Sequence, residues 1–507
     1  MKAPRSFVMI AAALVWLLCS GANLAAQTRV SIGVTETIET HNPYGDSVSL
    51  LYGIWSEITG PFCTYNYDKG EFEGRLAERW KVENPTTWLF YLNKNYTFND
   101  GSPVTADDVV HSLMNRVIGD PQSKQKASVA GPIAKAEVVD KSTVRFMTKQ
   151  PAAPMLSFVC DRLIVTSKAA FEKYGRDAAD KQHMMGGGPY RLKELLPGQR
   201  MVIAKRPDHP EAKKNPAAPD EIVFRVMREV EQRVTALLNN EVDIAQFIPP
   251  HLRVRVEKAP HLRIQPVDSI EIMFLAMQPK PPFDKKEVRQ AVCHAINRDQ
   301  IIKTLLEGFA SRLDGPLGPG QYGYDPNLKP RYDYNPEKSK KLLAQAGYPN
   351  GISVELQTPV GRYTLDKQVT EAMTAMLNAA GVRARLLTPE WPTLWAGVQK
   401  GQVPFYYMGR GSVLDPSAAL HQYFRTGETP RIGYSNKQLD ELLDKEQQEF
   451  DPKKRREYLS QAMSILTEEA PACFMWRHKL LWGLSSKVDY KPLPDGRIYG
   501  LDMKVKK

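Results

Sequence analysis

The sequence predicts an α/β fold that is divided into two or three domains. The chain has 507 residues, which is too long for a single hydrophobic core. Segments with the two-residue period of strands alternate along it with helical segments, an order typical of α/β architectures. Its 42% hydrophobic and 25% charged residues are ordinary for a soluble globular protein and show no sign of disorder.

Strands and helices alternate through the first half of the chain. Thr105 and Asp108 have the spacing of a capping box and predict a helix that starts at residue 106. Gly186-Gly187-Gly188, before Pro189 and Tyr190, predicts a chain reversal, because such sites need positive φ or a close backbone approach. Strands are predicted at 29–34, 88–92, 143–148, 201–204, 222–227, 242–244 and 272–277, and a helix at 231–240.

The second half repeats this order. Residues 286–306 predict one long helix, and the glycine- and proline-rich residues 314–326 predict a loop. Gly347 fits as the C-terminal cap of a helix that begins near Asn335. Further helices are predicted at 365–380 and 439–449, and strands at 352–357 and 382–387.

The first 26 residues have the features of a signal peptide. Lys2 and Arg5 give a positive start, residues 7–18 form an apolar run, and Ala25-Ala26 fits a small-residue cleavage site. The apolar run is shorter than the roughly 20 residues that span a bilayer. Cys19 follows Leu18 rather than a small residue, which disfavours a lipid anchor. We therefore expect an exported, soluble mature protein.

Charge and motifs exclude several classes of function. Removing Lys2 and Arg5 lowers the formal net charge from +11 to +9, but no arginine-rich arm or basic face with interleaved aromatics supports nucleic-acid binding. The motifs of zinc proteases, α/β-hydrolases, phosphate loops and dinucleotide-binding folds do not occur. We therefore expect no catalytic residues, no metal ligands and no cofactor.

Four cysteines remain after export, namely Cys63, Cys160, Cys293 and Cys473. In an oxidising compartment they can form disulfides, and the sequence leaves all three pairings open. No C-x-x-C occurs, which argues against a zinc ribbon. We expect Cys293 in the core.

The stretch from Met408 to Phe424 is the strongest candidate for a ligand site. Asp415 fits as a helix N-cap with Pro416 at the first helical position, so the free N–H groups of that helix would face the preceding loop. On local sequence alone, a helix cap beside core aromatics explains the same pattern. The aromatic residues that would line an apolar pocket are Trp391, Trp395, Tyr406, Tyr407, Tyr423 and Phe424.

One long run resembles the signature of a known family. From Leu76 to Leu113 the chain reads L-A-E-R-W, then W-L-F-Y-L, then Y-T-F-N-D-G-S-P-V-T-A-D-D-V-V-H-S-L. This is similar to family-five extracellular solute-binding proteins, the peptide/nickel-type receptors of ABC importers. G-G-P-Y at 187–190, E-Q-R-V-T-A-L-L-N-N-E-V-D-I at 231–244, E-W at 390–391 and T-E-E-A-P at 467–471 follow in the family's order. The resemblance covers nearly all of the mature chain.

The resemblance implies a periplasmic-binding-protein-like fold of type II, with two lobes, an extra subdomain in the first lobe and a ligand cleft between the lobes. Lobe I would comprise residues 27–272 and 480–507, with the subdomain at about 60–180, and lobe II would comprise 273–479. A monomeric periplasmic receptor would capture its ligand by hinge closure. It would pass the ligand to the permease and ATPase complex of an ABC importer and meet the membrane only through that permease.

The resemblance also implies which residues contact the ligand. They are Trp391, Tyr407, Arg410, Gly411, Ser412, Asp415, Gly188, Tyr190 and Met277. The run Arg206 to Pro210 departs from the family's pattern at another usual contact region.

Three substitutions shape the expected ligand. Ser412 stands where peptide receptors of the family have an aspartate for the ligand's amino terminus, and such a charge-assisted bond is worth about 1.5–3 kcal/mol. Arg410 stands in place of a tryptophan, and arginine binds carboxylate or phosphate in a forked geometry. Ser417 replaces the histidine of nickel-type receptors, with His421 one turn on.

We therefore expect a peptide or another amphiphilic solute with an anionic group near Arg410. Arg410 would alternatively pair with an acid at the lobe surface. A non-peptide ligand (an anionic organic solute, or a nickel or haem complex), a chemoreceptor-presenting role and, least favoured, a secreted hydrolase remain the alternatives.

Overall fold

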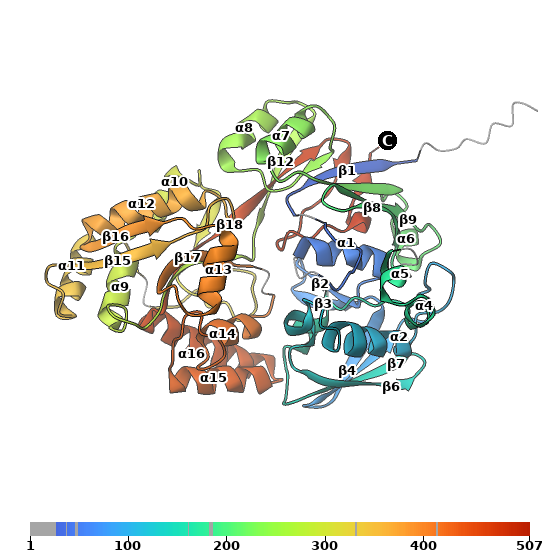
Figure 1. Ribbon diagram of the computed structural model, residues 1–507, viewed down its shortest axis with the longest axis horizontal. Coiled ribbons are helices and arrows are strands. Elements are labelled where there is room, and N and C mark those ends of the chain that lie inside the picture. The colour runs from blue at the N-terminus through green and yellow to red at the C-terminus, as the bar shows by residue number, and fades with distance from the viewer. Residues whose placement is uncertain are drawn as a thin grey trace, which may run out of the picture.

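The computed structural model describes residues 27–36, 38–45, 49–160, 162–181, 186–329, 332–411 and 414–506. Two lobes lie side by side, and strands that run from one to the other connect them at one end (Figure 1). The first lobe holds most of the N-terminal half, and the second most of the C-terminal half. This is the two-lobed α/β fold that the sequence predicts. The predicted signal peptide, residues 1–26, lies outside the described residues.

The sheet of the first lobe is built around β1. Val30, Ile32 and Val34 of this strand are fully buried, as its alternating sequence predicts. β1 pairs in parallel with β10 and β11. In sheet order the strands are β8 (Tyr190–Leu196), β9 (Arg200–Lys205), β10 (Glu221–Val226), β1 (Arg29–Val34), β11 (Ile244–Ala245) and β18 (Ala472–Ser485), with β12 (Leu262–Asp268) also on β18. The helices are α1 (Ser49–Thr59), α6 (Pro210–Lys214), α7 (Val230–Leu238) and α8 (Arg253–Glu257), and the short strands β19 (Val488–Asp489) and β20 (Lys504–Val505) pair near the C-terminus.

A smaller antiparallel sheet packs on the first lobe. Its order is β4 (Ala77–Asn84), β5 (Thr87–Leu92), β7 (Thr143–Thr148) and β6 (Ile133–Asp140), beside the hairpin β2 (Cys63–Asn66) and β3 (Glu71–Gly74). The capping box is confirmed, because the Asp108 carboxylate accepts the Thr105 N–H at 2.9 Å. The helix α2 (Ala106–His111) continues as a π-helical turn, Ser112–Ile118. The other helices are a π-helical turn at Lys126–Ala130, α3 (Met155–Val159), α4 (Lys168–Tyr174) and α5 (Arg176–Lys181).

The sheet of the second lobe places three parallel strands side by side. β15 (Ile352–Gln357) pairs in parallel with β16 (Val382–Leu387) and with β17 (Phe405–Arg410). β13 (Ile272–Met277) follows β17, and β14 (Ala310–Arg312) pairs with β18. The helices are α9 (Lys286–His294), α10 (Arg298–Thr304), α11 (Pro336–Gln345), α12 (Asp366–Ala379), α13 (Trp391–Gln399), α14 (Ser417–Phe424), α15 (Lys437–Gln448) and α16 (Pro452–Glu469).

The prediction of one helix over residues 286–306 is wrong. α9 ends at His294, and α10 begins at Arg298. The Asn297 side chain accepts the Gln300 N–H at 3.0 Å, and so forms an N-cap where the sequence pattern continues unbroken. The break turns Arg298 inward, where its guanidinium donates to the carbonyl oxygens of Leu313 and Phe474.

β18 belongs to both sheets. Residues 472–476 pair with β13 in the second lobe, and residues 479–485 pair with β12 in the first. The segment between β12 and β13 crosses in the opposite direction. The predicted lobe boundaries near 272 and 480, and the subdomain limits near 60 and 180, stay predictions.

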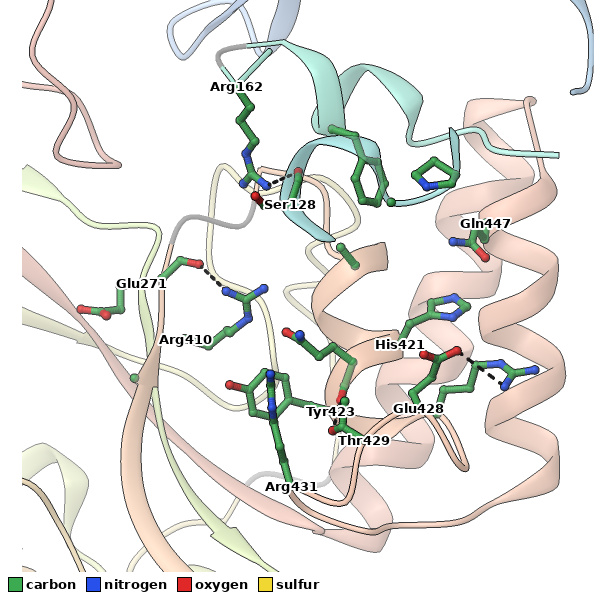
Figure 2. Close-up of a pocket in the computed structure, with 18 of the residues that line it drawn as sticks. Ser128, Arg162, Glu271, Arg410, His421, Tyr423, Glu428, Thr429, Arg431 and Gln447 are labelled. Carbon is green, nitrogen blue, oxygen red and sulfur yellow. Dashed lines mark hydrogen bonds and ion pairs between the residues drawn. The ribbon is translucent and has the colours of Figure 1, made fainter. Parts of the chain in front are cut away.

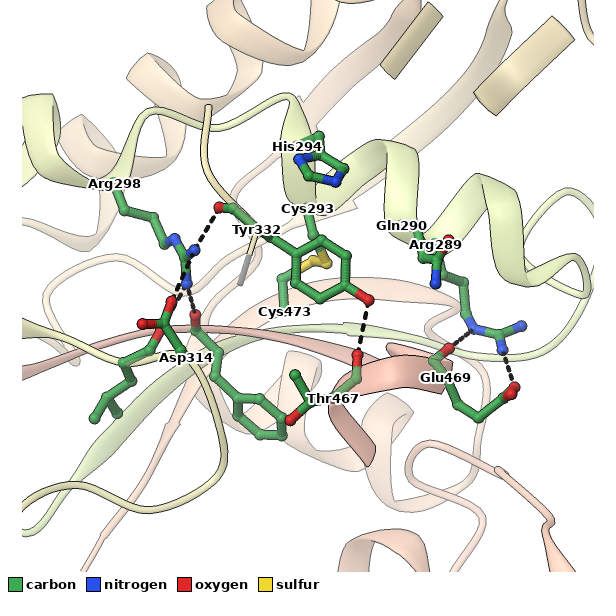
Figure 3. The surroundings of a disulfide bond; sticks show 12 residues. Arg289, Gln290, Cys293, His294, Arg298, Asp314, Tyr332, Thr467, Glu469 and Cys473 are labelled. Carbon is green, nitrogen blue, oxygen red and sulfur yellow. Dashed lines mark hydrogen bonds and ion pairs between the residues drawn. A yellow bond between two sulfur atoms is a disulfide. The ribbon is translucent and has the colours of Figure 1, made fainter. Parts of the chain in front are cut away.

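Two disulfides select one of the three pairings that the sequence leaves open. Cys63 bonds to Cys160 in the core of the first lobe, and Cys293 bonds to Cys473 in the core of the second (Figure 3). Cys293 is buried, as expected. Neither disulfide joins the two lobes, so both leave the connection between them free to bend.

Candidate functional site

A cavity of about 910 Å³ lies between the two lobes. Its volume is in the range of small-molecule sites. Figure 2 shows Arg162 and Ser128 of the first lobe on one side, and Arg410, Tyr423 and Arg431 of the second lobe on the other. The cavity therefore occupies the cleft in which the sequence predicts the ligand.

The topology of the second lobe explains how its wall is assembled. The carboxyl ends of parallel strands share one edge of a sheet, where ligands bind in many α/β folds. The segment after β15 carries Arg362 and Tyr363, the helix after β16 carries Trp391 and Trp395, and β17 ends at Arg410. Segments far apart in sequence thus meet in one wall.

Basic side chains dominate this cavity. Eight of the lining residues are lysine or arginine and three are acidic. The basic residues are Lys124, Lys149, Arg162, Arg362, Arg410, Arg425, Arg431 and Arg497, and the acidic ones are Glu271, Glu428 and Asp444. A concave site with this balance of charge attracts anions.

Arg410 is the cationic residue among the candidate ligand contacts, and it lines the cavity. Its guanidinium donates to the Gly411 carbonyl at 3.2 Å and lies 5.9 Å from the ring centroid of Tyr423 (Figure 2). Its buried Nε has no hydrogen-bond partner, and no carboxylate within the described ranges lies within 4.0 Å. Burial lowers the pKa of Arg410. The alternative of an ion pair at the lobe surface is not seen in the described part of the chain.

Arg362 and Arg431 line the cavity together with Arg410, and neither is among the contacts predicted from the sequence. Arg362 lies 5.3 Å from the ring centroid of Trp391, and Arg431 lies 4.7 Å from that of Trp395. The two tryptophans stack at 5.5 Å, because they are four residues apart on α13. Among the described residues, neither arginine has a carboxylate within 4.0 Å. The one sequence feature that could have indicated a ligand contact is the position of Arg362 after a strand of a parallel sheet, since ligands often bind at the carboxyl ends of such strands.

Three of the nine predicted contacts line the cavity: Trp391, Arg410 and Gly411. Ser412 lies outside the described residues. The other five are Tyr407, Asp415, Gly188, Tyr190 and Met277, and the structure places them away from this cavity.

Local packing keeps four of these five residues away from the cavity. Tyr407 is fully buried on the opposite face of β17, where its ring centroid is 6.1 Å from that of Trp476. Met277, at the far end of β13, is also fully buried. The Tyr190 hydroxyl donates to the Pro219 carbonyl at 2.9 Å. A Cβ on Gly188 would lie 2.2 Å from the Glu57 carbonyl oxygen, so glycine serves a close backbone approach there.

Asp415 is held by contacts within the protein. The prediction that it is the N-cap is wrong by one position, because α14 begins at Ser417 with Pro416 as its cap. Asp415 accepts the Ser417 N–H at 3.0 Å, and both its oxygens bind Arg455 at 2.6 Å. This paired carboxylate fastens the end of the loop to α16.

The described residues show neither a metal site nor a membrane-spanning helix. Within the ranges that the structure describes, no group of three or more histidine, cysteine, aspartate or glutamate side chains is placed to hold a metal ion. His421 contacts the Leu443 carbonyl at 3.1 Å. No described helix combines the length and the apolar character that crossing a membrane requires.

The two lobes also touch at the edge of the cavity, near Gln150 and Gln447. Figure 1 shows α15, which carries Gln447, at the end of the second lobe away from the crossing strands. The Ala153 N–H donates to the Gln447 carbonyl at 2.8 Å, and the Gln150 amide donates to the Gln447 side chain at 3.2 Å. The ring of Phe450, which follows α15, lies 6.0 Å from that of Trp88 and packs against the core of the first lobe. We call these contacts the rim contacts.

Comparison with known proteins agrees with this geometry. Residues 71–431 match the family model described as bacterial extracellular solute-binding proteins, family 5 middle. The glutathione-binding protein GsiB of Escherichia coli (strain K12) is 27% identical over 90% of this chain and 90% of its own. HbpA2 from Haemophilus parasuis has a TM-score of 0.81 at 23% identity, with 95% of this chain and 100% of that chain covered. The periplasmic binding protein DppA from Helicobacter pylori, in complex with the peptide STSA, has a TM-score of 0.78 at 23% identity, with 95% and 98% covered. The chain therefore belongs to family 5 of the bacterial extracellular solute-binding proteins.

Proposed function

We propose that this solute-binding protein is a receptor for acidic peptides and peptide-like solutes. After export and cleavage of residues 1–26, it would act in the periplasm as a monomer. It would hand its ligand to the permease and ATPase of an ABC importer and catalyse no reaction. The observation that carries the proposal is the group of three arginines, Arg362, Arg410 and Arg431, without carboxylate partners among the described residues.

The three arginines suit a carboxylate-rich ligand. A guanidinium can donate two parallel hydrogen bonds to one carboxylate, and such charge-assisted pairs are among the strongest polar contacts. The stacked rings of Trp391 and Trp395 offer a flat apolar surface for the backbone of a peptide. Glutathione, the ligand in the name of the GsiB relative, is a tripeptide with two carboxylates and one ammonium, and belongs to the proposed class.

Hinge closure follows from the position of the cationic groups. Lys124, Lys149 and Arg162 line the cavity from the first lobe, and Arg362, Arg410 and Arg431 line it from the second. A ligand with two anionic groups can contact both sets only when the lobes are close together. Its binding therefore favours the closed arrangement, which is the form that an importer would recognise.

Calorimetric titration tests the proposal. The mature protein, freed of co-purified solute by mild unfolding and refolding, is titrated with glutathione, Glu-Glu, Ala-Ala and Lys-Lys, and with citrate as an acid that lacks amide bonds. We expect binding of the acidic peptides and at least 10-fold weaker binding of the neutral and basic ones, as one lost charge-assisted contact implies. Equal binding of Ala-Ala and Glu-Glu would contradict the proposal. A preference for citrate over every peptide would favour the non-peptide alternative.

The rim contacts give a prediction that does not depend on ligand chemistry. Phe450→Ala removes an aromatic contact that holds the lobes together. Such a pair is worth about 0.5–1.5 kcal/mol, so every ligand that requires the closed arrangement should bind about 2- to 10-fold more weakly. Small-angle scattering of the ligand-free variant should show a more open average shape.

The matched control is Tyr334→Ala, which removes an exposed aromatic side chain of the second lobe. This control should leave affinity and scattering unchanged. A loss in Phe450→Ala for acidic ligands alone would show that Phe450 affects the binding site instead of the closure.

A further inference from the structure

One carboxylate lies in this basic cavity without a partner. Glu271 directly precedes β13, on the segment that crosses between the lobes, and its backbone N–H donates to the Ser269 hydroxyl at 2.9 Å. Of the three acids on the cavity wall, Asp444 and Glu428 each lie within 4.0 Å of Arg425. Across the described ranges, the Glu271 side chain has no hydrogen bond and no ion pair within that distance.

The neighbouring strand leaves space for this carboxylate. Ile272 pairs with Arg410 in the β13–β17 register, so Glu271 lies beside the glycines that flank Arg410. A Cβ on Gly409 would be 2.9 Å from Glu271 Oε1, and one on Gly411 would be 3.6 Å from it. A side chain at position 409 would therefore displace the acid. Figure 2 shows Glu271 and Arg410 along the same wall.

The described residues around Glu271 give its carboxylate no hydrogen bond and no close ion pair. Burial is the largest influence and, together with the charge of Glu36, raises the pKa of the Glu271 carboxyl, while the charges of Arg362 and Arg410 lower it. A partly desolvated carboxylate without a hydrogen-bond donor is costly, unless a bound group supplies the missing cation. The end of β17 and the residues after it, Gly409 to Leu414, have the sequence G-R-G-S-V-L and contain no acid.

We propose that Glu271 binds the ammonium group of the ligand, while Arg410 and Arg362 bind its carboxylates. The cavity would then select solutes that carry one free amine and at least two carboxylates, over diacids without an amine. This inference rests on the proposed function and specifies the ligand class within it. It assigns amine recognition to the segment between the lobes rather than to the loop after β17.

The assignment is tested on both sides of the contact. Wild-type protein and Glu271→Gln are titrated with glutathione and Glu-Glu, and with the N-acetylated form of each. For the wild type, we expect acetylation to weaken binding about 10-fold or more. For Glu271→Gln, the free-amine form should bind about 10-fold or more weakly than to the wild type, and acetylation should have little further effect. Such coupling identifies a direct contact.

Glu428→Gln is the matched control, because it removes another acid of the same wall that already lies near Arg425. This variant should prefer the free-amine peptides over their N-acetylated forms by the same factor as the wild type does. Equal affinity of the wild type for the free and acetylated probes would overturn the assignment and leave the proposed function intact. Failure of all the acidic probes to bind the wild type would overturn the proposed function, and the assignment with it.

Discussion

Arg410→Ala is expected to weaken the binding of acidic peptides by about 10- to 150-fold. The guanidinium is enclosed by the cavity wall, and among the described residues its one hydrogen bond is to the carbonyl of Gly411. A carboxylate that binds there gains a charge-assisted contact worth about 1.5–3 kcal/mol, which corresponds to that range of affinity. Calorimetric titration with glutathione and Glu-Glu measures the loss.

Arg425→Ala is the matched control for this prediction. Arg425 lines the same cavity, but its guanidinium already binds both oxygens of Asp444 at 2.8 and 3.0 Å. Removing it should change the affinity for acidic peptides by about 5-fold at most, since exposed ion pairs contribute about 0–1 kcal/mol. Unchanged affinity in Arg410→Ala, or an equal loss in both variants, would refute the role given to Arg410.

Thermal unfolding separates this loss of affinity from a loss of stability. Arg410→Ala removes a desolvated cation that has no acidic partner in the described chain, so it should not lower the melting temperature of the ligand-free protein. In the presence of saturating ligand, the wild type should gain more stability than the variant, because ligand bound only to the native state stabilises it in proportion to its affinity.

The site was only partly predictable, because its residues come from segments that are distant in sequence. Arg410 and Trp391 could be found because they occupy positions in motifs of the family. Arg362 and Arg431 lie outside any motif, and only the parallel pairing of β15 with β17 brings Arg362 to the wall. Glu271 directly precedes β13 and lies outside the motifs that resemble the family.

Errors within predicted elements have a common physical cause. Tyr407 belongs to the right strand, but successive side chains of a strand point to opposite faces, and the sequence did not reveal which face meets the cleft. Asp415 is of a residue type that often caps helices, but in the folded protein its carboxylate is paired with Arg455. Periodicity and capping signals thus located strands and helices, while partner choice depended on tertiary contacts.

The largest change in stability is expected from removing the disulfide of the second lobe. Cys293 on α9 and Cys473 on β18 are 180 residues apart in sequence, and both are buried in the core of that lobe (Figure 3). Cross-linking so long a segment restricts the unfolded chain strongly, and the double variant Cys293→Ser/Cys473→Ser should lose about 3–5 kcal/mol of unfolding free energy. Scanning calorimetry of the ligand-free protein measures the shift.

The matched control is Cys63→Ser/Cys160→Ser, which opens a separation of 97 residues in the first lobe. If the lobes unfold as separate units, each double variant should lower only the transition of its own lobe. Because neither disulfide joins the lobes or lines the cavity, both variants should bind acidic peptides within about 2-fold of the wild type at temperatures where they remain folded. A large loss of affinity in either folded variant would show that core packing within a lobe, and not the crossing segments alone, controls closure of the cleft.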